Sequence, residues 1–175
     1  MRKLNSLMVC GVLAWTGAAS AASVTVTMNA VNADGIGDIL GTVVFQDSAR
    51  GLKVMPNLSG LSEGQHGFHV HQHSSCQPKV KGDKTVPALS AGGHFDAKKT
   101  GKHEGPDGTG HLGDLRVLYV DSAGRATRSS FARRLKTSDL KGRAVMIHAG
   151  GDNYSDSPKK LGGGGARVAC GVVVY

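Results

Sequence analysis

Histidines gather in one short segment of the 175-residue chain. The sequence HGFHVHQHSSC, residues 66–76, holds four of the eight histidines and ends on a cysteine. Within it, His69 and His71 stand two residues apart, and on a β-strand such residues project from the same face. Neutral imidazoles are good ligands for copper and zinc. The pair therefore predicts one side of a transition-metal site.

A second group of possible ligands follows in a glycine-rich stretch. It consists of three histidines and one carboxylate: His94, His103, His111 and Asp114. Three imidazoles and a carboxylate suit tetrahedral Zn²⁺, and the glycines of GTGHLGDL let the backbone turn around an ion. Any one loop histidine could simply be solvated, but four potential ligands in one loop favour a zinc site. His148, at the end of a later strand-like run, could complete the first site.

The elements that must position these residues are strands. SVTVTMNAV, residues 23–31, alternates apolar and polar positions, which is a strand signal. Seven further runs carry a similar signal: GTVVFQ, GLKVMPNL, GQHGFHVH, LRVLYVD, RATRSSF, RAVMIHA and RVACGVVVY. Turns rich in Gly, Asn, Asp or Pro separate most of them. About eight short strands predict an all-β fold, an eight-stranded antiparallel Greek-key barrel or sandwich of the immunoglobulin-like kind.

Three segments depart from the strand pattern. TSDLKGR predicts a brief helical turn with Thr137 or Ser138 as its cap. Residues 74–113 and 149–166 show little strand pattern and much glycine. Long irregular loops in a compact domain are uncommon and usually functional, although disordered linkers are the alternative. Because residues 74–113 contain three spaced histidines, we expect this segment to be an ordered functional loop.

The first residues predict a targeting segment. Arg2 and Lys3 precede a mostly apolar stretch, and Ala19-Ser20-Ala21 fits a small-x-small cleavage site. We therefore predict a signal peptide over residues 1–21 and a mature, exported domain over residues 22–175. The apolar stretch is too short to span a bilayer, so we expect no membrane anchor of that kind.

Cysteine usage agrees with export. Of the three cysteines, Cys10 lies inside the predicted signal peptide, in a context unsuited to lipoprotein processing, so we expect no lipid anchor. Cys76 and Cys170 remain, and in an oxidising compartment they predict a disulfide, with two free thiols as the alternative. The disulfide would close a loop of about a hundred residues, which the chain-entropy model values at about 4–5 kcal/mol.

The chain is basic, with a formal net charge of +8 that falls to +6 without the signal peptide. Its densest basic region comprises Arg125, Arg128, Arg133, Arg134 and Lys136. A nucleic-acid surface would require clustered Lys and Arg with aromatics between them, and aromatics are only 5% of the chain. We therefore expect no nucleic-acid partner and assign most basic residues to a solvated surface. Guidance of a small anion is the alternative.

Longer motifs carry a family resemblance. GFHVH, AGGHFD, GKHEGPDGTGHLGDL and GGDNYSDSPKKLGGGGARVACGVV together resemble copper,zinc superoxide dismutase in its bacterial periplasmic form. The resemblance covers essentially the whole mature chain. It implies a periplasmic enzyme that converts two superoxide anions and two protons to oxygen and hydrogen peroxide. Its cofactors would be Cu(II)/Cu(I) and Zn²⁺, its partner the small substrate anion, and its assembly a monomer or a homodimer.

The resemblance also implies residue roles. Copper would be held by His69, His71, His94 and His148. Zinc would be held by His94, His103, His111 and Asp114, so that His94 bridges the two ions and serves in catalysis. Asp152 would accept hydrogen bonds from His69 and His103. Arg167 would stand beside copper as a catalytic partner for the anion, and Cys76 and Cys170 would form the disulfide.

Two histidines and two lysines carry less specific predictions. We expect His66 to be a hydrogen-bonded packing residue near the site. We expect His73 to be a solvated loop histidine, with an accessory metal-capture role as the alternative. Lys159 and Lys160 are candidates for long-range guidance of substrate, with exposed lysines on a mobile loop as the alternative.

A metal-sequestering or metal-delivering protein on the same scaffold is the rival function, because a fold does not fix an activity. Arg167 disfavours the rival, since an arginine beside the metal serves an anionic substrate and has no obvious use in storage. A basic adhesion module is a second rival, and the scattered basic residues disfavour it.

Overall fold

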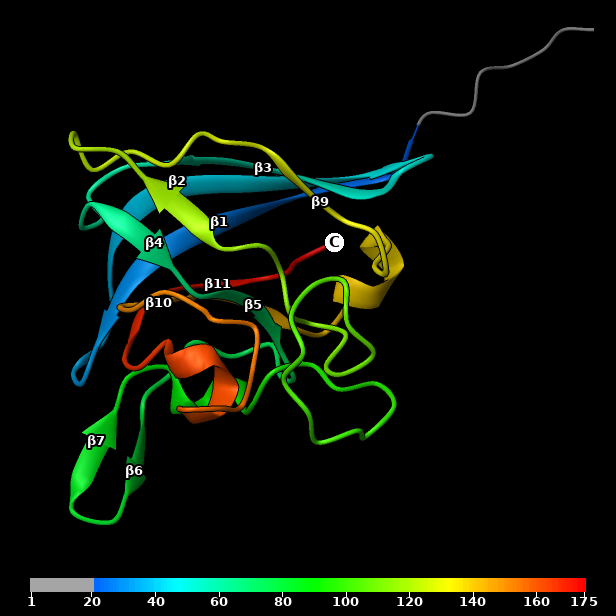
Figure 1. Ribbon diagram of the computed structural model, residues 1–175. Coiled ribbons are helices and arrows are strands. Elements are labelled where there is room, and N and C mark those ends of the chain that lie inside the picture. Colours follow the sequence, from blue (N-terminus) through cyan, green and yellow to red (C-terminus); the bar gives the residue numbers. More distant parts are fainter. Residues whose placement is uncertain (1–20) are drawn as a thin grey trace, which may run out of the picture.

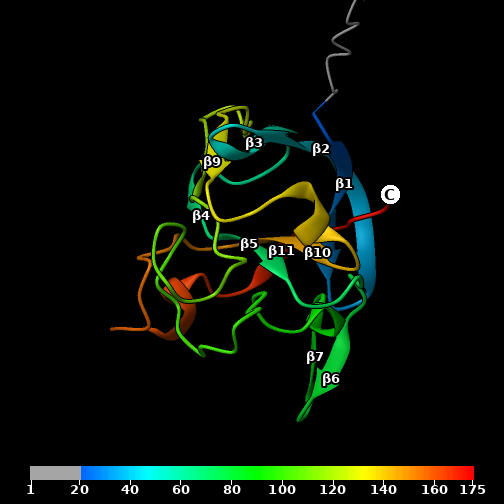
Figure 2. The same cartoon turned by 90° about the vertical axis from the view of Figure 1, so that its right-hand side faces the viewer.

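A curled antiparallel sheet organises the chain. The computed structural model describes residues 21–175, and within them seven strands form one sheet in the order β5-β10-β11-β1-β2-β3-β9. These strands are β1 (Ser23–Asn32), β2 (Gly35–Ser48), β3 (Gly51–Leu58), β5 (Phe68–His71), β9 (Ser130–Ala132), β10 (Ala144–His148) and β11 (Arg167–Val172). The sheet bends into an open barrel, seen from two sides in Figure 1 and Figure 2.

Two smaller pairs of strands complete the β-structure. β4 (Gly64–His66) pairs with β8 (Leu118–Val120), and β4 lies between the β9 edge and the β5 edge of the curled sheet (Figure 2). β6 (Lys79–Lys81) and β7 (Lys84–Val86) form a hairpin that projects away from the barrel (Figure 1). The prediction of an all-β Greek-key barrel is confirmed, and each of the eight predicted runs contains a strand.

The hairpin corrects the prediction of an irregular loop over residues 74–113. Its turn contains Gly82, whose φ of 60° lies in the left-handed region that glycine adopts easily. The sequence VKGDKTV did contain this turn signal, between two runs of alternating polar and β-branched residues. The strands are exposed, however, so no apolar alternation identified them.

The brief helical turn is present as the 3₁₀ helix η2 (Thr137–Leu140), but its predicted cap is wrong. The cap position is Lys136, whose backbone N–H donates to the Asp139 carboxylate at 2.8 Å. Thr137 begins the helix and donates its hydroxyl to Asp47 on β2. The Thr137 hydroxyl therefore bonds to Asp47, a residue distant in sequence, instead of capping the helix. The other two 3₁₀ helices are η1 (Leu89–Ala91) and η3 (Lys160–Gly163).

Two hydrophobic clusters lie on opposite faces of the sheet. The larger fills the barrel, and the smaller surrounds the disulfide between Cys76 and Cys170. β5 and β10 are buried on both faces, so their alternation divides side chains between the two clusters. Val145 and Ile147 enter the barrel, whereas Met146 joins the disulfide cluster. The face opposite the barrel interior is therefore covered by loops.

Most of the predicted signal peptide, residues 1–20, lies outside the described residues. Between residues 21 and 175, no helix combines the length and the apolar character needed to cross a membrane.

Candidate metal centre

Strand alternation places the first histidines. On β5, Phe68 and Val70 enter the barrel core, so His69 and His71 project to the opposite face. β10 pairs antiparallel with β5, with Met146 opposite His69. His148 shares the strand parity of Met146 and therefore lies on the same face as the β5 pair. Three histidines from two neighbouring strands are thus gathered on one surface of the sheet.

The loop that follows β5 returns along the free edge of that strand. His94 pairs with His71, and Asp114 pairs with His69, as two isolated β-bridges. Backbone hydrogen bonds join Phe95 to Val70 in the same region, at 2.8 Å. The edge strand therefore aligns both ends of the loop, and this alignment brings His94 and Asp114 beside the strand histidines.

Orphaned polar atoms mark candidate ligand positions. Among residues 21–175, six buried side-chain nitrogen or oxygen atoms have no hydrogen-bond partner. They are Nδ1 of His69, Nε2 of His71, Nδ1 of His103, Nδ1 of His111, Oδ2 of Asp114 and Nε2 of His148. Buried polar atoms are normally paired, because an unpaired one costs about 1–3 kcal/mol. An atom set of metal-ligating types that lacks partners fits bound metal ions.

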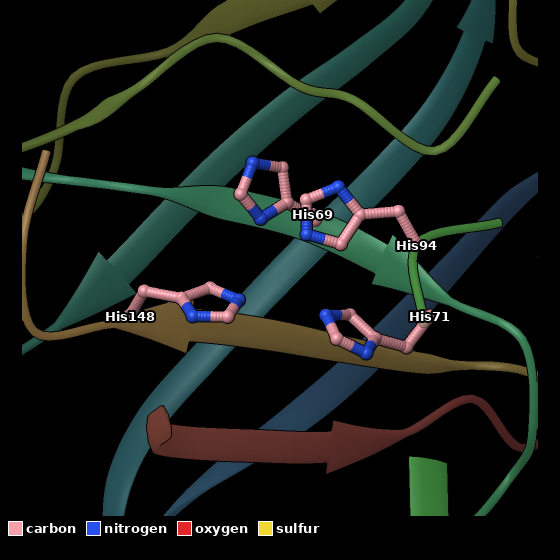
Figure 3. A group of neighbouring side chains, drawn as sticks. All are labelled: His69, His71, His94 and His148. Carbon is pink, nitrogen blue, oxygen red and sulfur yellow. The ribbon is translucent and has the colours of Figure 1, made fainter. Parts of the chain in front are cut away.

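The first group consists of four buried histidines: His69, His71, His94 and His148. One ligand nitrogen from each lies within 4.8 Å of those of the others. Figure 3 shows the two β5 histidines, the β10 histidine and the loop-borne His94 with their rings turned toward a shared space. Four imidazoles without a thiolate or carboxylate suit a copper ion.

The second group converges on Asp114. Nδ1 of His94 lies 3.0 Å from Oδ1 of Asp114, and Nδ1 of His103 lies 2.9 Å from Oδ2. Nδ1 of His111 is more distant, 3.6 Å from Oδ1. The most compact cluster accordingly contains His69, His94, His103 and Asp114, and His111 lies at its margin. Three imidazoles and a carboxylate around one point suit Zn²⁺.

Asp152 links the two groups. Its Oδ2 accepts a hydrogen bond from Nε2 of His69 and its Oδ1 accepts one from Nε2 of His103, both at 2.8 Å. These bonds fix the rings so that the Nδ1 atoms face inward. Gly162 is required beside this carboxylate, because a Cβ there would overlap Oδ1 of Asp152 and because its φ is 71°. The predicted bonds from both histidines to Asp152 are therefore present.

Backbone carbonyls orient two further ligands. Nδ1 of His71 donates to the carbonyl oxygen of Gly92 at 2.9 Å, and Nδ1 of His148 donates to that of Gly165 at 3.1 Å. In both rings a backbone carbonyl engages Nδ1, which leaves Nε2 free on the side of the space that the four histidines share.

Burial keeps the strand histidines neutral. Desolvation and the neighbouring histidines lower the pKa of His69 to about 3 and that of His148 to about 4. Desolvation also lowers the pKa of His71 and of His94. Neutral imidazole is the form that binds a metal ion. The rings of His69, His71 and His148 are therefore available as ligands at neutral pH without loss of a proton, whereas His94 must lose its remaining N–H proton to hold both ions.

At His103 the neighbouring carboxylates outweigh the effect of burial, so the pKa rises instead of falling. Burial opposes its charge, but the ion pair with Asp114 and the hydrogen bond with Asp152 raise its pKa to about 9. Burial likewise opposes the charge on the two carboxylates. Their hydrogen bonds with the histidines nevertheless hold the pKa of each carboxyl well below its usual range. The ionised carboxylates of Asp114 and Asp152 thus place negative charge beside the second group, which favours a divalent cation.

Arg167 lies beside the first group at the start of β11. Its guanidinium donates to the carbonyl oxygens of Ala88 at 2.5 Å and Gly92 at 2.6 Å. Arg167 pairs with His148 across β10 and β11 and shares the Gly92 carbonyl with His71, and its charge lowers the pKa of both histidines. Gly92 therefore anchors a ligand and the arginine together, and the disulfide at Cys76 fastens the same loop to β11. The predicted disulfide is confirmed.

Arg134 organises the second group in a way that the sequence did not reveal. Its guanidinium donates four hydrogen bonds to carbonyl oxygens of the histidine-bearing loop, those of Gly105, Pro106, Gly110 and His111. From the sequence alone, Arg134 is expected among the solvated basic residues, because no local pattern distinguishes it from Arg133. Its partners lie 23–29 residues away.

Other predicted residues occupy the expected surroundings. His66 is buried, with Nδ1 2.7 Å from the carbonyl oxygen of His148 and Nε2 2.8 Å from that of Ser62, as expected for a packing residue. His73 is exposed, in agreement with a solvated loop histidine. Lys159 and Lys160 are exposed as well.

Comparisons with known proteins agree with this site. A family model described as copper/zinc superoxide dismutase (SODC) matches residues 39–173. Superoxide dismutase Cu-Zn 2 of Salmonella typhimurium is 54% identical over 174 residues, 99% of either chain. A Cu/Zn superoxide dismutase structure from Brucella abortus has a TM-score of 0.86 and 47% identity. A monomeric copper, zinc superoxide dismutase from Salmonella enterica has a TM-score of 0.79 and 55% identity. Each structure is covered completely by 87% of this chain.

An all-β barrel with two overlapping groups of buried ligands defines a metalloprotein for two adjacent transition-metal ions. This chain belongs to the copper/zinc superoxide dismutase family. It is an oxidoreductase that acts on superoxide, and its histidine and aspartate groups fit copper and zinc.

Proposed function

We propose that the chain dismutates superoxide through the following assignment of residues. His69, His71, His94 and His148 hold copper, and His94, His103, His111 and Asp114 hold zinc. The observation that carries this assignment is that the six orphaned buried atoms all belong to these residues. His94 is common to both sets because its Nδ1 faces Asp114 while its ring stacks on His69, 3.8 Å between centroids.

When bound, copper supplies the one-electron oxidation of one superoxide and the one-electron reduction of another, while zinc supplies a fixed charge. Two superoxide anions and two protons become one O₂ and one H₂O₂. Nδ1 of His94 faces Asp114 and would be the nitrogen that holds zinc, so Nε2 is the atom of this ring that can take up and release a proton. The residue can thus store and release a proton beside the reacting anion.

Arg167 binds the anion in this proposal. Hydrogen bonds to the carbonyls of Ala88 and Gly92 hold the guanidinium still, and they use only part of its five N–H groups. The remaining donors can receive a superoxide oxygen next to the first histidine group. Arginine remains charged across the working pH range, which suits a monoanionic substrate.

Lys159 and Lys160 guide superoxide at longer range in the same proposal. Both are exposed at the start of η3, in the loop that also contains Asp152. Replacement of both by Gln should lower the rate and weaken its dependence on ionic strength. An unchanged salt dependence would remove these lysines from the mechanism.

Superoxide dismutation by the purified mature protein, with metal analysis before and after chelation, tests the activity. Activity should disappear on chelation and return with copper. Arg167→Ala should slow the reaction while copper stays bound, whereas Arg125→Ala, on the exposed surface, should do neither. Zinc binding without copper-dependent activity would instead favour the metal-sequestering protein.

We further propose that residues 1–21 are a signal peptide, that the mature domain is residues 22–175, and that it works in the periplasm. The pattern of small and apolar residues supports cleavage after Ala21, and the disulfide supports an oxidising compartment. The similar structure from Salmonella enterica is a monomeric copper, zinc superoxide dismutase, which supports a monomer over a homodimer. N-terminal sequencing of periplasmic protein and sedimentation analysis test these points.

A further inference from the structure

A second charged site lies outside the metal centre. A cavity of about 280 Å³ is lined by four arginines, Arg50, Arg116, Arg128 and Arg133, together with serines and aromatic rings. None of the histidines or aspartates of the metal centre lines it. The arginines come from separate segments: the turn between β2 and β3, the residues before β8, and both sides of β9. Only folding brings them to one cavity.

The charges around this cavity are poorly compensated. Arg116 donates to Asp107 at 2.6 Å, but within residues 21–175 no carboxylate forms a salt bridge with Arg50, Arg128 or Arg133. Like charges that line a cleft repel one another and focus a positive potential in it. A bound anion would relieve this repulsion.

Stacking prepares two of the guanidiniums for an anion. Arg128 lies over the ring of Tyr119 at 4.8 Å, and Arg50 lies over the ring of Phe131 at 4.3 Å. A guanidinium whose face rests on an aromatic ring keeps its in-plane N–H groups free to donate. The ring also restricts the side chain before binding, so less conformational entropy is lost when a ligand arrives.

Further polar groups surround the same space. Ser129 and Ser130 belong to the lining, as does Tyr154. The Tyr154 oxygen accepts a hydrogen bond from the backbone N–H of Val117 at 3.0 Å, which leaves its own hydroxyl proton free to donate. Hydroxyl-bearing residues therefore line the same cavity as the arginines.

We propose that this arginine cavity, defined by Arg50, Arg116, Arg128 and Arg133, binds a phosphate group. Three uncompensated guanidiniums match the three terminal oxygens and two negative charges of a phosphate monoester, and the guanidinium fork fits phosphate oxygens in pairs. The cavity is at the small end of ligand pockets, which suits a phosphate with a short attached group. The site is separate from Arg167 and independent of the dismutation mechanism.

Titration of inorganic phosphate and of glycerol phosphate into ¹⁵N-labelled, metal-loaded protein with copper reduced tests the site. The backbone amides of Ser129 and Ser130 should shift with saturation and a dissociation constant of about 1 mM or lower. Shifts that occur only around Arg167, or that grow without saturation, would overturn the proposal.

Matched variants distinguish specific binding in the cavity from a general effect of positive charge. Arg128→Gln with Arg133→Gln should weaken binding about tenfold or more, since both guanidinium forks lose their charge-assisted hydrogen bonds to phosphate oxygens. Arg125→Gln with Lys98→Gln removes the same charge from exposed positions outside the cavity and should change binding less than about twofold. Arg128→Lys with Arg133→Lys keeps the charge but loses the fork, so an intermediate loss is expected. Equal losses in the Gln pairs would overturn the proposal.

Vesicles distinguish the source of the phosphate. Phosphatidylglycerol vesicles and phosphatidylcholine vesicles are compared for co-sedimentation with the metal-loaded protein. Retention on phosphatidylglycerol alone, lost in the Arg128→Gln, Arg133→Gln variant, would support a lipid headgroup in the cavity. Glycerol phosphate binding without vesicle retention would support a small soluble ester. Retention that the variant does not change, without phosphate binding at Ser129 and Ser130, would overturn the proposal.

Discussion

The two ligand groups are held by different kinds of structure. Three of the four histidines in the first group lie on β5 and β10, whose paired backbones share the barrel core. His103 and His111 instead lie in a loop with little regular structure. Strand positions are fixed by register, whereas loop positions depend on particular side chains. The strand group is therefore prepared by the fold, and the loop group by a few tertiary contacts.

Removal of the disulfide should produce the largest difference between the groups. Cys76→Ser with Cys170→Ser should lower the free energy of unfolding by about 4–5 kcal/mol, because the bond closes a loop with a sequence separation of 94. Denaturant titration of the metal-free protein measures this change. Zinc affinity should fall more than copper affinity. Equal losses of the two metals would contradict the comparison.

Asp152→Asn should lower the affinity of both groups for their metal ions. The amide keeps the size of the carboxylate, but its NH₂ faces a histidine N–H that needs an acceptor. We expect affinity for each metal to fall about 10–100-fold, as for other partners of ligating histidines. Competition with chelators measures both affinities. A loss confined to copper or to zinc would show that Asp152 supports only one group.

Arg134→Ala should lower the affinity for zinc about tenfold and leave the affinity for copper nearly unchanged, because the four hydrogen bonds of Arg134 all reach the histidine-bearing loop. The neighbouring variant Arg133→Ala is the matched control, since that side chain is exposed and makes no such bonds. Chelator competition for zinc distinguishes the two. An equal loss of zinc affinity in both variants would show that the lost charge, and not the lost support of the loop, is responsible.

The number of protons released on metal binding should give the smallest difference between the two groups. At pH 7 His103 is protonated in the metal-free chain, because its pKa is about 9, so zinc binding should release about one proton from it. His69 and His148 are already neutral, so copper binding should release none from them. Calorimetry in buffers of different ionisation enthalpy measures these numbers.

The same raised pKa has a defined effect on stability. Since the pKa of His103 is higher in the folded metal-free chain than the unfolded value of about 6.5, its contribution is complete below that value. The contribution is lost as the pH rises through about 9. A metal-free protein whose stability did not decline over this interval would contradict the assignment of the proton to His103.

The sequence by itself determined much of the centre. The spacing of His69 and His71 on a strand fixed their common face, since side chains alternate along any β-strand. The ligand types in the loop indicated zinc, and the two cysteines left after the signal peptide indicated the disulfide. Eight short strand-like runs determined the all-β class. These features depend on local geometry and chemistry, which a single chain displays directly.

Only the tertiary structure decided how distant residues meet. It turned His94 and Asp114 toward the edge of β5 through bridges that no local pattern encodes. It separated two adjacent arginines, placing Arg134 on the carbonyls of the loop and Arg133 in the arginine cavity. The physical reason is that burial, pairing and charge compensation depend on partners tens of residues away, and the folded chain alone brings those partners together.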